Sequence, residues 1–308
     1  MIIKTYRKKG CGFVGQDYRS WERSWGDIKN IEKSYRNAEK DYSSFFCKRY
    51  FPRPPKKILE GGCGTGKYVY AYKKLGYDII GVDFAGKTVE IINKNFPTLP
   101  VLKANVLDLP FEDGYFDCYY SGGVIEHFEE GPDKAIKEAR RVLKKDGVFL
   151  AFVPYINLLR RIRFTFSSHS KKNDLISVKV VKCNVESVPY ANYAFCEYMF
   201  DPDSISRYLK RNGFIVEKVY STDFLWGELG SVFRWFLKRR KTKRDRSEIS
   251  ADKRDLLIDD PAQRKSLLNK ILYSFFITED LDNKYFCLPL SFLDYLSGHI
   301  IAVVARAN

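Results

Sequence analysis

The sequence predicts a three-layer α/β fold, in which a mainly parallel, twisted β-sheet carries helices on both faces. Three observations predict it. Short apolar segments alternate with helix-compatible segments between residues 56 and 154. A glycine-rich turn, GGCGTG at 61–66, joins the first of these strands to the first helix. A β-branched segment, HIIAVVARA at 299–307, can add a closing strand near the end of the chain.

Composition limits the environment and the partners. With 308 residues and 45% hydrophobic content, the chain can form one large domain with an accessory region. Its formal charge of +15 favours an anionic partner: nucleic acid, a membrane surface or a phosphorylated substrate. The seven cysteines form no CxxC pair, which predicts neither a disulfide framework nor a metal site and fits a reducing compartment such as the cytoplasm. Without a signal-like or membrane-spanning apolar run, we expect a cytoplasmic protein, peripheral at the membrane at most.

The N-terminal region, 1–55, is expected to be a flap and a helix. Residues 1–27 place aromatics such as Trp21 among charges without a clear period, which predicts an irregular flap. From Asp27, a candidate N-cap, apolar residues recur at intervals of three and four as far as Phe46. This spacing predicts one amphipathic helix that ends before the proline linker FPRPPKK.

The core is expected to span 56–154, with strands at KILEG, DIIGVDF, PVLKANV, FDCYYSG and GVFLAFVP. Helices are predicted from Lys67, from Lys87 and from Pro132 to Lys144. In parallel sheets of this kind, ligands bind beyond the carboxyl ends of the strands.

Two insertions interrupt the pattern. Residues 155–200 combine a basic RRIRF with an aromatic PYANYAFCEYMF and are predicted to form a substrate cap. Residues 201–221 return to the core, with a helix capped by Asp201 or Asp203 and the strand FIVEKVYS. Residues 222–297 are predicted to be a helical, basic insertion, and 298–308 the final core strand.

The glycine turn narrows the choice of ligand. Its GxGxG spacing is one residue short of the dinucleotide fingerprint GxGxxG, and the chain has no phosphate-binding GxxxxGK[ST] motif. A cofactor without phosphates is therefore favoured.

Five motifs follow one another in an order that resembles the class I S-adenosylmethionine-dependent methyltransferases, particularly the branch of quinone-biosynthesis and glycan- or lipid-tailoring enzymes. They are LEGGCGTG, GVDF, ANVLDLPFEDGYFD, SGGVIEHF and EARRVLKKDGVFLAFVP. The resemblance covers 56–154 closely and 214–221 with 299–305 loosely. It implies a Rossmann-like sheet of seven strands, the last one antiparallel, and S-adenosyl-L-methionine as cofactor.

At the methionine end, the resemblance implies that the turn of Gly62, Gly64 and Gly66 passes around the cofactor. Glu60 would accept hydrogen bonds from the cofactor's ammonium group or, alternatively, only from the amides of the turn. Thr65 would donate to the methionine carboxylate, and Tyr18 of the flap would fold over the cofactor together with Trp21. Ordinary packing of an N-terminal arm is the alternative for these aromatics.

At the nucleoside end, Asp83 lies 17 residues after Gly66 and is expected to bind the ribose hydroxyls; the alternative is that it caps the next helix. Phe84 would lie along the adenine ring or in the core. Asn105 stands where the family commonly has an aspartate, and its side-chain oxygen would accept from the adenine amine. The amide of Val106 would donate to a ring nitrogen, with Asp108 as an alternative acceptor.

The segment SGGVIEHF is expected beside the reacting methyl group, with Ser121 next to the sulfonium. His127 is the general-base candidate and Glu126 its neighbour; packing against the helix beneath is the alternative for His127. The absence of [DN]PP[YF] after this strand disfavours methylation of a base amine in nucleic acid.

The sequence leaves the acceptor open. An acceptor is expected to be held by aromatic and basic residues of the cap: Tyr155, Arg160, Arg161, Tyr190, Tyr193 and Phe195. The apolar-then-basic stretch 224–246 suits peripheral contact with a membrane, or else a solvated loop. The predicted function is O-methylation of a small-molecule, glycan or lipid-linked acceptor, with C-methylation disfavoured. An RNA methyltransferase and a non-catalytic S-adenosylmethionine-binding partner protein are the alternatives, and the oligomeric state is not predicted.

Overall fold

The computed structural model describes residues 1–9, 17–25, 27–38, 42–166, 169–172, 175–180, 192–222 and 300–308. The chain divides into two compact units, one made of Met1–Ile156, Arg160–Ser221 and Ile300–Asn308, the other of Asn157–Leu159 and Thr222–His299. The first unit holds both β-sheets. The predicted basic insertion at 222–297, including the stretch 224–246, lies almost entirely outside the described residues.

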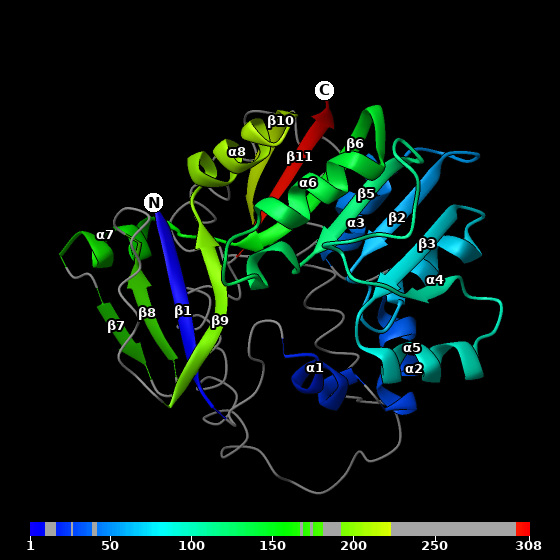
Figure 1. Cartoon of the computed structure of the whole chain (residues 1–308), viewed down its shortest axis with the longest axis horizontal. Helices are drawn as coiled ribbons and strands as arrows, with labels where there is room; N and C mark the ends of the chain where they lie inside the picture. The colour runs from blue at the N-terminus through cyan, green and yellow to red at the C-terminus, as the bar shows by residue number, and fades with distance from the viewer. Residues whose placement is uncertain are drawn as a thin grey trace, which may run out of the picture. The chain divides into compact units, whose positions relative to one another are not determined.

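A seven-stranded sheet forms the centre of the first unit, in the order β10-β11-β6-β5-β2-β3-β4 (Figure 1). Its strands are β2 (Lys57–Gly61), β3 (Asp78–Asp83), β4 (Val101–Lys103), β5 (Phe116–Gly122), β6 (Leu143–Pro154), β10 (Phe214–Thr222) and β11 (Ile300–Ala307). The pairs from β4 to β6 are parallel, and β11 runs antiparallel to β6. The predicted fold class is therefore confirmed.

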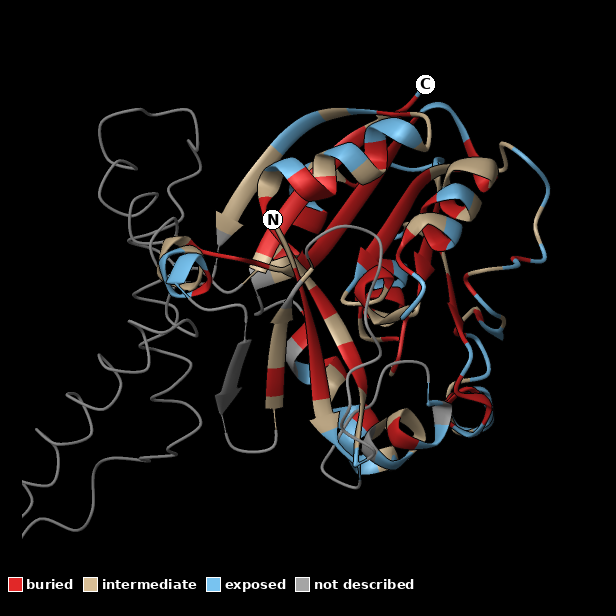
Figure 2. Ribbon diagram, turned by 60° about the vertical axis from the view of Figure 1, so that its left-hand side comes forward, coloured by how far each residue is buried: buried red, intermediate tan, exposed pale blue. Residues whose placement is uncertain are grey.

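Helices cover both faces of this sheet because successive strand residues point to opposite sides. In β6, Phe149 and Ala151 join a core with α6 (Asp133–Val142) and α8 (Pro202–Arg211). The intervening Val148 and Leu150 join a second core. That core contains α2 (Ile28–Asn37), α3 (Tyr42–Tyr50), α4 (Lys67–Lys74) and α5 (Gly86–Asn95). Figure 2 shows the buried residues concentrated in the strands between these layers.

The helix starts predicted from capping residues are confirmed, but one predicted helix is wrong in length. Asp27 caps α2 by accepting from the amide of Lys29, and Asp201 forms a capping box with Ser204 at α8. The single helix expected from Asp27 to Phe46 is two helices, α2 and α3. The apolar residues of both enter the same core, so their periodicity alone did not reveal the break.

A second, four-stranded sheet has the order β7-β8-β1-β9 and is drawn at the left of Figure 1. Its strands are β1 (Ile2–Lys8), β7 (His169–Lys172), β8 (Leu175–Lys179) and β9 (Tyr193–Phe200). β1 pairs antiparallel with both β8 and β9. The irregular flap expected for residues 1–27 is wrong for β1. The segment 155–200, predicted as a cap, supplies the strands that pair with β1 across more than half of the chain.

One side of this second sheet packs into the core that contains Phe149, α6 and α8. Tyr6, Phe195 and Phe200 are buried there, and Tyr6 meets Phe195 edge to face. The sheet is also joined to β6, since Tyr155 and Phe200 form a parallel bridge. The second sheet is thus packed beside the strand ends where ligands are expected.

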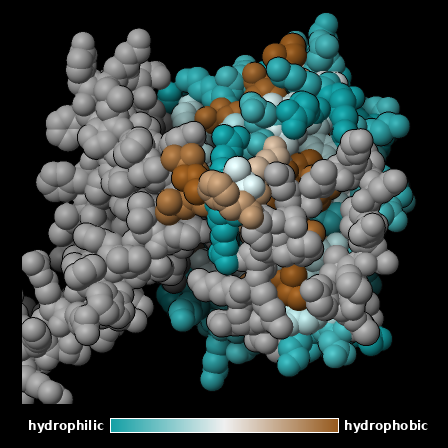
Figure 3. All heavy atoms as spheres, turned by 90° about the vertical axis from the view of Figure 1, so that its left-hand side faces the viewer, coloured by the Kyte–Doolittle hydropathy of each residue, from teal (hydrophilic) through white to brown (hydrophobic). Residues whose placement is uncertain are grey.

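The remaining described helices are α1 (Tyr18–Trp25), α7 (Leu158–Phe166) and the short 3-10 helix η2 (Ile125–His127). On the face drawn in Figure 3, hydrophobic residues form small groups within a largely hydrophilic described surface. None of the described helices combines the length and the apolar character needed to cross a bilayer.

Candidate functional site

The glycine turn lies where β2 ends and α4 begins. Gly62, Gly64 and Gly66 have φ angles of +72°, +54° and +70°, a backbone region that other residues enter only with strain. A Cβ atom on Gly62 would lie 2.4 Å from the side chain of Val124, just beyond the end of β5. Glycine is therefore required both for the conformation of the turn and for its approach to the neighbouring strand.

Asp83 ties this turn to the next strand. Its Oδ2 accepts from the amide of Gly64 at 2.7 Å, and its Oδ1 accepts from the amide of Ala85 at 2.9 Å. Burial raises the pKa of the carboxyl group, and these amides oppose the rise. The N-cap of α5 is Ala85, so Asp83 orders the approach to that helix without being its cap residue. Each oxygen keeps a further lone pair for a ligand hydroxyl.

Glu60 and Thr65 are held by contacts with the helices α4 and α2. Oε2 of Glu60, which is 4% exposed, accepts from the amide of Val69 in α4 at 3.2 Å. The hydroxyl of Thr65 lies 2.9 Å from that of Ser34 in α2. Glu60 thus bonds to an amide in the first turn of α4, and its contact with the cofactor's ammonium group stays a prediction.

Tyr35 of α2 also reaches the turn. Its hydroxyl oxygen is 3.7 Å from the position of a Cβ on Gly66 and has no hydrogen-bond partner among the described residues. Burial raises its pKa. Ser34 and Tyr35 were missed because the sequence marks α2 only by its apolar period.

Helix α1 contacts the site at three points. A Cβ on Gly64 would lie 3.3 Å from the ring of Trp25, and Trp21 meets the His127 ring edge to face with centroids 4.9 Å apart. Glu22 accepts from the amide of Lys87 at the start of α5 at 3.1 Å. α1 therefore spans from the glycine turn to His127. Tyr18 begins this helix, and its side chain lies outside the described part.

The residues expected at the nucleoside end follow β3 and β4. Phe84 is 36% exposed just past Asp83, as a stacking surface requires. Oδ1 of Asn105 accepts from the amide of Leu107 at 3.0 Å, and the Asn105 carbonyl accepts from the amide of Asp108 at 3.0 Å. Val106 is buried beside this turn. The side-chain oxygen of Asn105 is thus shared with the loop itself.

Two polar atoms at and just after the carboxyl end of β5 are buried without partners among the described residues. Oγ of Ser121 and Oε2 of Glu126 accept or donate no hydrogen bond among the described residues, and both residues are at most 2% exposed. Burial raises the pKa of Glu126 well above its usual range. Buried polar groups are normally paired, so these two are candidates to meet a ligand.

His127 has a defined tautomer. Its Nδ1 lies 2.8 Å from the carbonyl oxygen of Cys196 in β9, and a carbonyl only accepts, so Nδ1 carries the proton. Burial lowers the pKa of His127, which keeps Nε2 as a free lone pair at neutral pH. Nε2 is 4.0 Å from Oε1 of Glu126. Trp21 of α1 also packs edge to face against the ring of His127.

The residues expected to hold an acceptor are largely engaged within the chain. Tyr155 is 1% exposed, and its carbonyl accepts from Nη1 of Arg160 at 2.6 Å. Nη2 of Arg161 forms an ion pair with Asp201 at 3.0 Å. Tyr193 is half-buried in β9, and Tyr190 lies outside the described residues.

These features fit S-adenosyl-L-methionine. The turn offers close backbone approach where the methionine end is expected, Phe84 is exposed at the nucleoside end, and Ser121 and Glu126 leave buried polar atoms unpaired between the turn and His127. No described feature at these positions calls for a phosphate-binding cofactor.

Comparison with known proteins agrees with this geometry. A methyltransferase-domain family matches residues 59–151, from β2 to β6. The chain carries an S-adenosylmethionine-dependent methyltransferase domain. That domain contains the glycine turn, Asp83, Asn105 and His127.

The curated relatives match this chain over less than half of their own length. The human "Probable tRNA methyltransferase 9B" is 30% identical over 164 residues, which is 53% of this chain and 31% of the relative. A "Probable S-adenosylmethionine-dependent methyltransferase" of Mycolicibacterium smegmatis is 30% identical over 99 residues, 32% of this chain and 38% of the relative. The chain spans less than half of each of these two relatives.

Among solved structures, a methyltransferase from Thermotoga maritima superposes with a TM-score of 0.47 at 17% identity, covering 94% of this chain and 99% of its own.

Proposed function

We propose that this protein transfers a methyl group from S-adenosyl-L-methionine to an oxygen atom of a small-molecule, glycan or lipid-linked acceptor, with His127 as general base. The observation that carries the proposal is the contact of the His127 Nδ1–H with the Cys196 carbonyl. It leaves the Nε2 lone pair of a neutral, buried imidazole at the carboxyl end of β5. A hydroxyl acceptor needs such a base, because it must lose its proton as the oxygen attacks.

The cofactor would be held along the strand ends. Gly62, Gly64 and Gly66 would accommodate its methionine end, with Glu60 and Thr65 ordering the turn and Tyr18 in the helix above it. Asp83 would take the ribose hydroxyls and Phe84 the adenine face, while Asn105 and Val106 would contact the adenine edge. Ser121 would lie beside the sulfonium. When bound, the cofactor supplies a methyl group on a positively charged sulfur, which leaves as a neutral thioether.

The chain's own residues would then do three things. Trp21 and Trp25 on α1 exclude water from the strand ends. Glu126, whose Oε2 is buried without a partner among the described residues, would form a hydrogen bond with the acceptor. His127 would take the hydroxyl proton of the acceptor on Nε2 as the acceptor oxygen receives the methyl group. The two insertions, 155–200 and 222–297, would supply acceptor contacts, with Tyr155, Arg160, Tyr190 and Tyr193 in the first of them.

A second candidate is methylation of RNA. Relatives in human and mouse are named "Probable tRNA methyltransferase 9B", and the charge of +15 suits a polyanion. We therefore keep RNA as the second acceptor class, and 224–246 as a proposed peripheral membrane contact.

The test is incubation of the purified chain with methyl-labelled S-adenosyl-L-methionine and fractionated extracts. We expect label in a lipid, glycan or small-molecule fraction, as a methyl ether. Label confined to RNA, with affinity that falls steeply as salt rises, would select the second candidate. Tight cofactor binding without transfer to any fraction would leave a non-catalytic binding protein.

The pH dependence tests the base. Because burial lowers the pKa of His127 below its usual 6.5, the transfer rate should rise with pH in the acid range and reach half of its maximum at a pH below 6.5. The rate rises with pH because the base acts in its neutral form. A lowered pKa keeps His127 neutral down to a more acid pH. A rate that still rises between pH 7 and 9 would exclude His127 as the base.

A further inference from the structure

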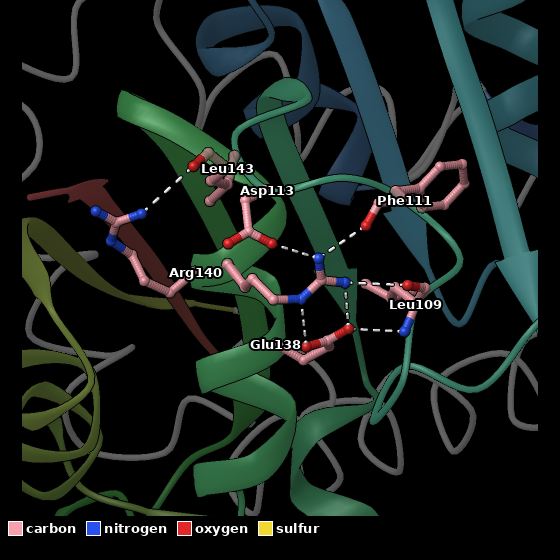
Figure 4. Close-up of polar contacts among 7 residues, drawn as sticks. Leu109, Phe111, Asp113, Glu138, Arg140 and Leu143 are labelled. Atoms are coloured by element: carbon pink, nitrogen blue, oxygen red, sulfur yellow. Dashed lines mark hydrogen bonds and ion pairs between the residues drawn. The ribbon is translucent and has the colours of Figure 1, made fainter.

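Arg141 of α6 holds the loop that follows β4. Its Nη1 donates to the carbonyl of Phe111 at 2.8 Å, and its Nη2 donates to the carbonyl of Leu109 at 3.0 Å (Figure 4). Both carbonyls belong to the loop between β4 and β5, which has no strand of its own. The guanidinium thus supplies contacts that a sheet would otherwise give to these backbone groups.

Glu138, one helical turn earlier, completes the arrangement. Its Oε2 and Oε1 accept from Nε and Nη2 of Arg141 at 2.9 and 2.7 Å, a two-bond fork. Oε1 also accepts from the amide of Leu109 at 2.7 Å. The pair therefore fixes both the amide and the carbonyl of Leu109, and we call it the Arg141–Glu138 clamp.

A third partner matters less. Asp113 accepts from Nη1 at 2.7 Å, but its side chain is 79% exposed, whereas that of Glu138 is 13% exposed. Exposed ion pairs contribute little because water screens them. The clamp therefore depends chiefly on Glu138, because the Glu138 carboxylate is less exposed to water than that of Asp113.

The clamped residue follows directly on the predicted adenine-binding segment. Asn105 and Asp108 bridge each other, and Leu109 comes next in the chain. The segment from Asn105 to Asp108 is thus fixed at one end by β4 and at the other by the clamp. Without the second anchor, the amide of Val106 and the side chain of Asn105 would sample other directions.

We propose that Arg141 and Glu138 are positioning residues for cofactor recognition, which set the direction of the hydrogen-bonding groups of Asn105 and Val106 and so determine selectivity for adenine. Neither residue touches the cofactor in this proposal. The inference rests on the proposed function, in which these two loop residues contact the adenine edge.

The neighbouring arginine offers a matched control. Arg140 donates to the carbonyls of Gly213 and Leu143, both at 3.3 Å, and to that of Asn308. Its described hydrogen bonds include none to the loop after β4, and Figure 4 shows its side chain directed to Leu143. Arg140→Lys therefore removes a comparable set of arginine-to-carbonyl contacts from the same helix.

The experiment measures the binding of S-adenosylhomocysteine and S-inosylhomocysteine to the full chain by calorimetry at 15 °C. The inosine compound carries an oxygen in place of the adenine amine, so the ratio of the two dissociation constants reports adenine selectivity. Circular dichroism at the same temperature confirms that each variant is folded. Glu138→Gln, a milder change that keeps an oxygen for the Leu109 amide, serves if Arg141→Lys does not fold.

We expect Arg141→Lys to weaken binding of the adenine compound about tenfold and to bring the ratio toward one. Glu138→Gln should change both in the same direction, and Arg140→Lys should leave both as in the wild type. If folded Arg141→Lys kept the wild-type affinity and the wild-type ratio, the inference would be overturned and the proposed function would stand. An equal loss in Arg140→Lys would also overturn it, since it would reveal a general effect of α6. A wild-type chain that binds neither compound would overturn the proposed function as well.

Discussion

The two sheets contribute to the site by different means. The seven-stranded sheet brings its residues together locally: Asp83 bonds to Gly64, 19 residues away, and both lie at adjacent strand ends. The four-stranded sheet contributes across a much longer stretch of chain, since the Cys196 carbonyl that orients His127 is 69 residues from it. We infer that the donor half of the site is formed by the methyltransferase domain itself. The acceptor half depends on how the second sheet packs against it.

The largest expected effect lies at the boundary of the two halves. His127→Asn should reduce transfer to an oxygen acceptor by about 10²- to 10⁴-fold, because the hydroxyl proton loses its acceptor. The rate is measured as label transferred per minute at saturating cofactor. An asparagine variant that retained wild-type turnover would show that the second sheet orients no catalytic group.

A smaller effect is expected within the donor half. Gly64→Ala should weaken S-adenosyl-L-methionine binding at least about tenfold, because its φ of +54° strains any other residue and the new Cβ would crowd Trp25. Gly76→Ala is the control, since Gly76 has a φ of +82° but nothing within 4 Å of its Cβ position. Both variants should lose similar stability. Equal loss of cofactor affinity in the two would contradict a binding role for the turn.

The smallest effect concerns the helix that supports the donor half. Tyr35→Phe should raise the free energy of unfolding of the cofactor-free protein by about 1 kcal/mol, because it removes a buried hydroxyl without a partner. Tyr50→Phe should do the opposite, since the Tyr50 hydroxyl lies 2.6 Å from that of Tyr220. Urea unfolding followed by circular dichroism gives both values. A destabilised Tyr35→Phe would mean that its hydroxyl has a partner in solution.

The difference between the two sheets, local contacts in one and distant pairing in the other, also explains what the sequence could predict. The alternation of strands and helices and the glycine turn predicted the parallel sheet and brought Gly64, Asp83 and Ser121 to one edge of it, while the family resemblance supplied its seven strands. These features depend on neighbours in sequence. The second sheet was missed because β1 pairs with β9 at a separation that no local period reveals, as in the pairing of Thr5 with Glu197.

The tautomer of His127 and the side-chain contacts of the site could not be predicted from the sequence either. His127 was named from its position, but its tautomer depends on a backbone carbonyl, which every residue carries alike. The contact of Trp25 with Gly64 and the hydroxyl pair of Ser34 and Thr65 require the packing of α1 and α2. The Arg141–Glu138 clamp was present in the motif EARRVLKKDG, where charge alone did not show which arginine faces the loop.

The most direct test of this division is S-adenosyl-L-methionine binding by Asp83→Ala and His127→Asn, measured by calorimetry on the same preparation. Asp83 belongs to the donor half, where its carboxylate orders the turn and is expected to bind ribose, so its loss should weaken binding at least about tenfold. His127 serves the acceptor, so His127→Asn should bind as the wild type does. Unchanged binding by Asp83→Ala, or equal losses in both variants, would contradict the account.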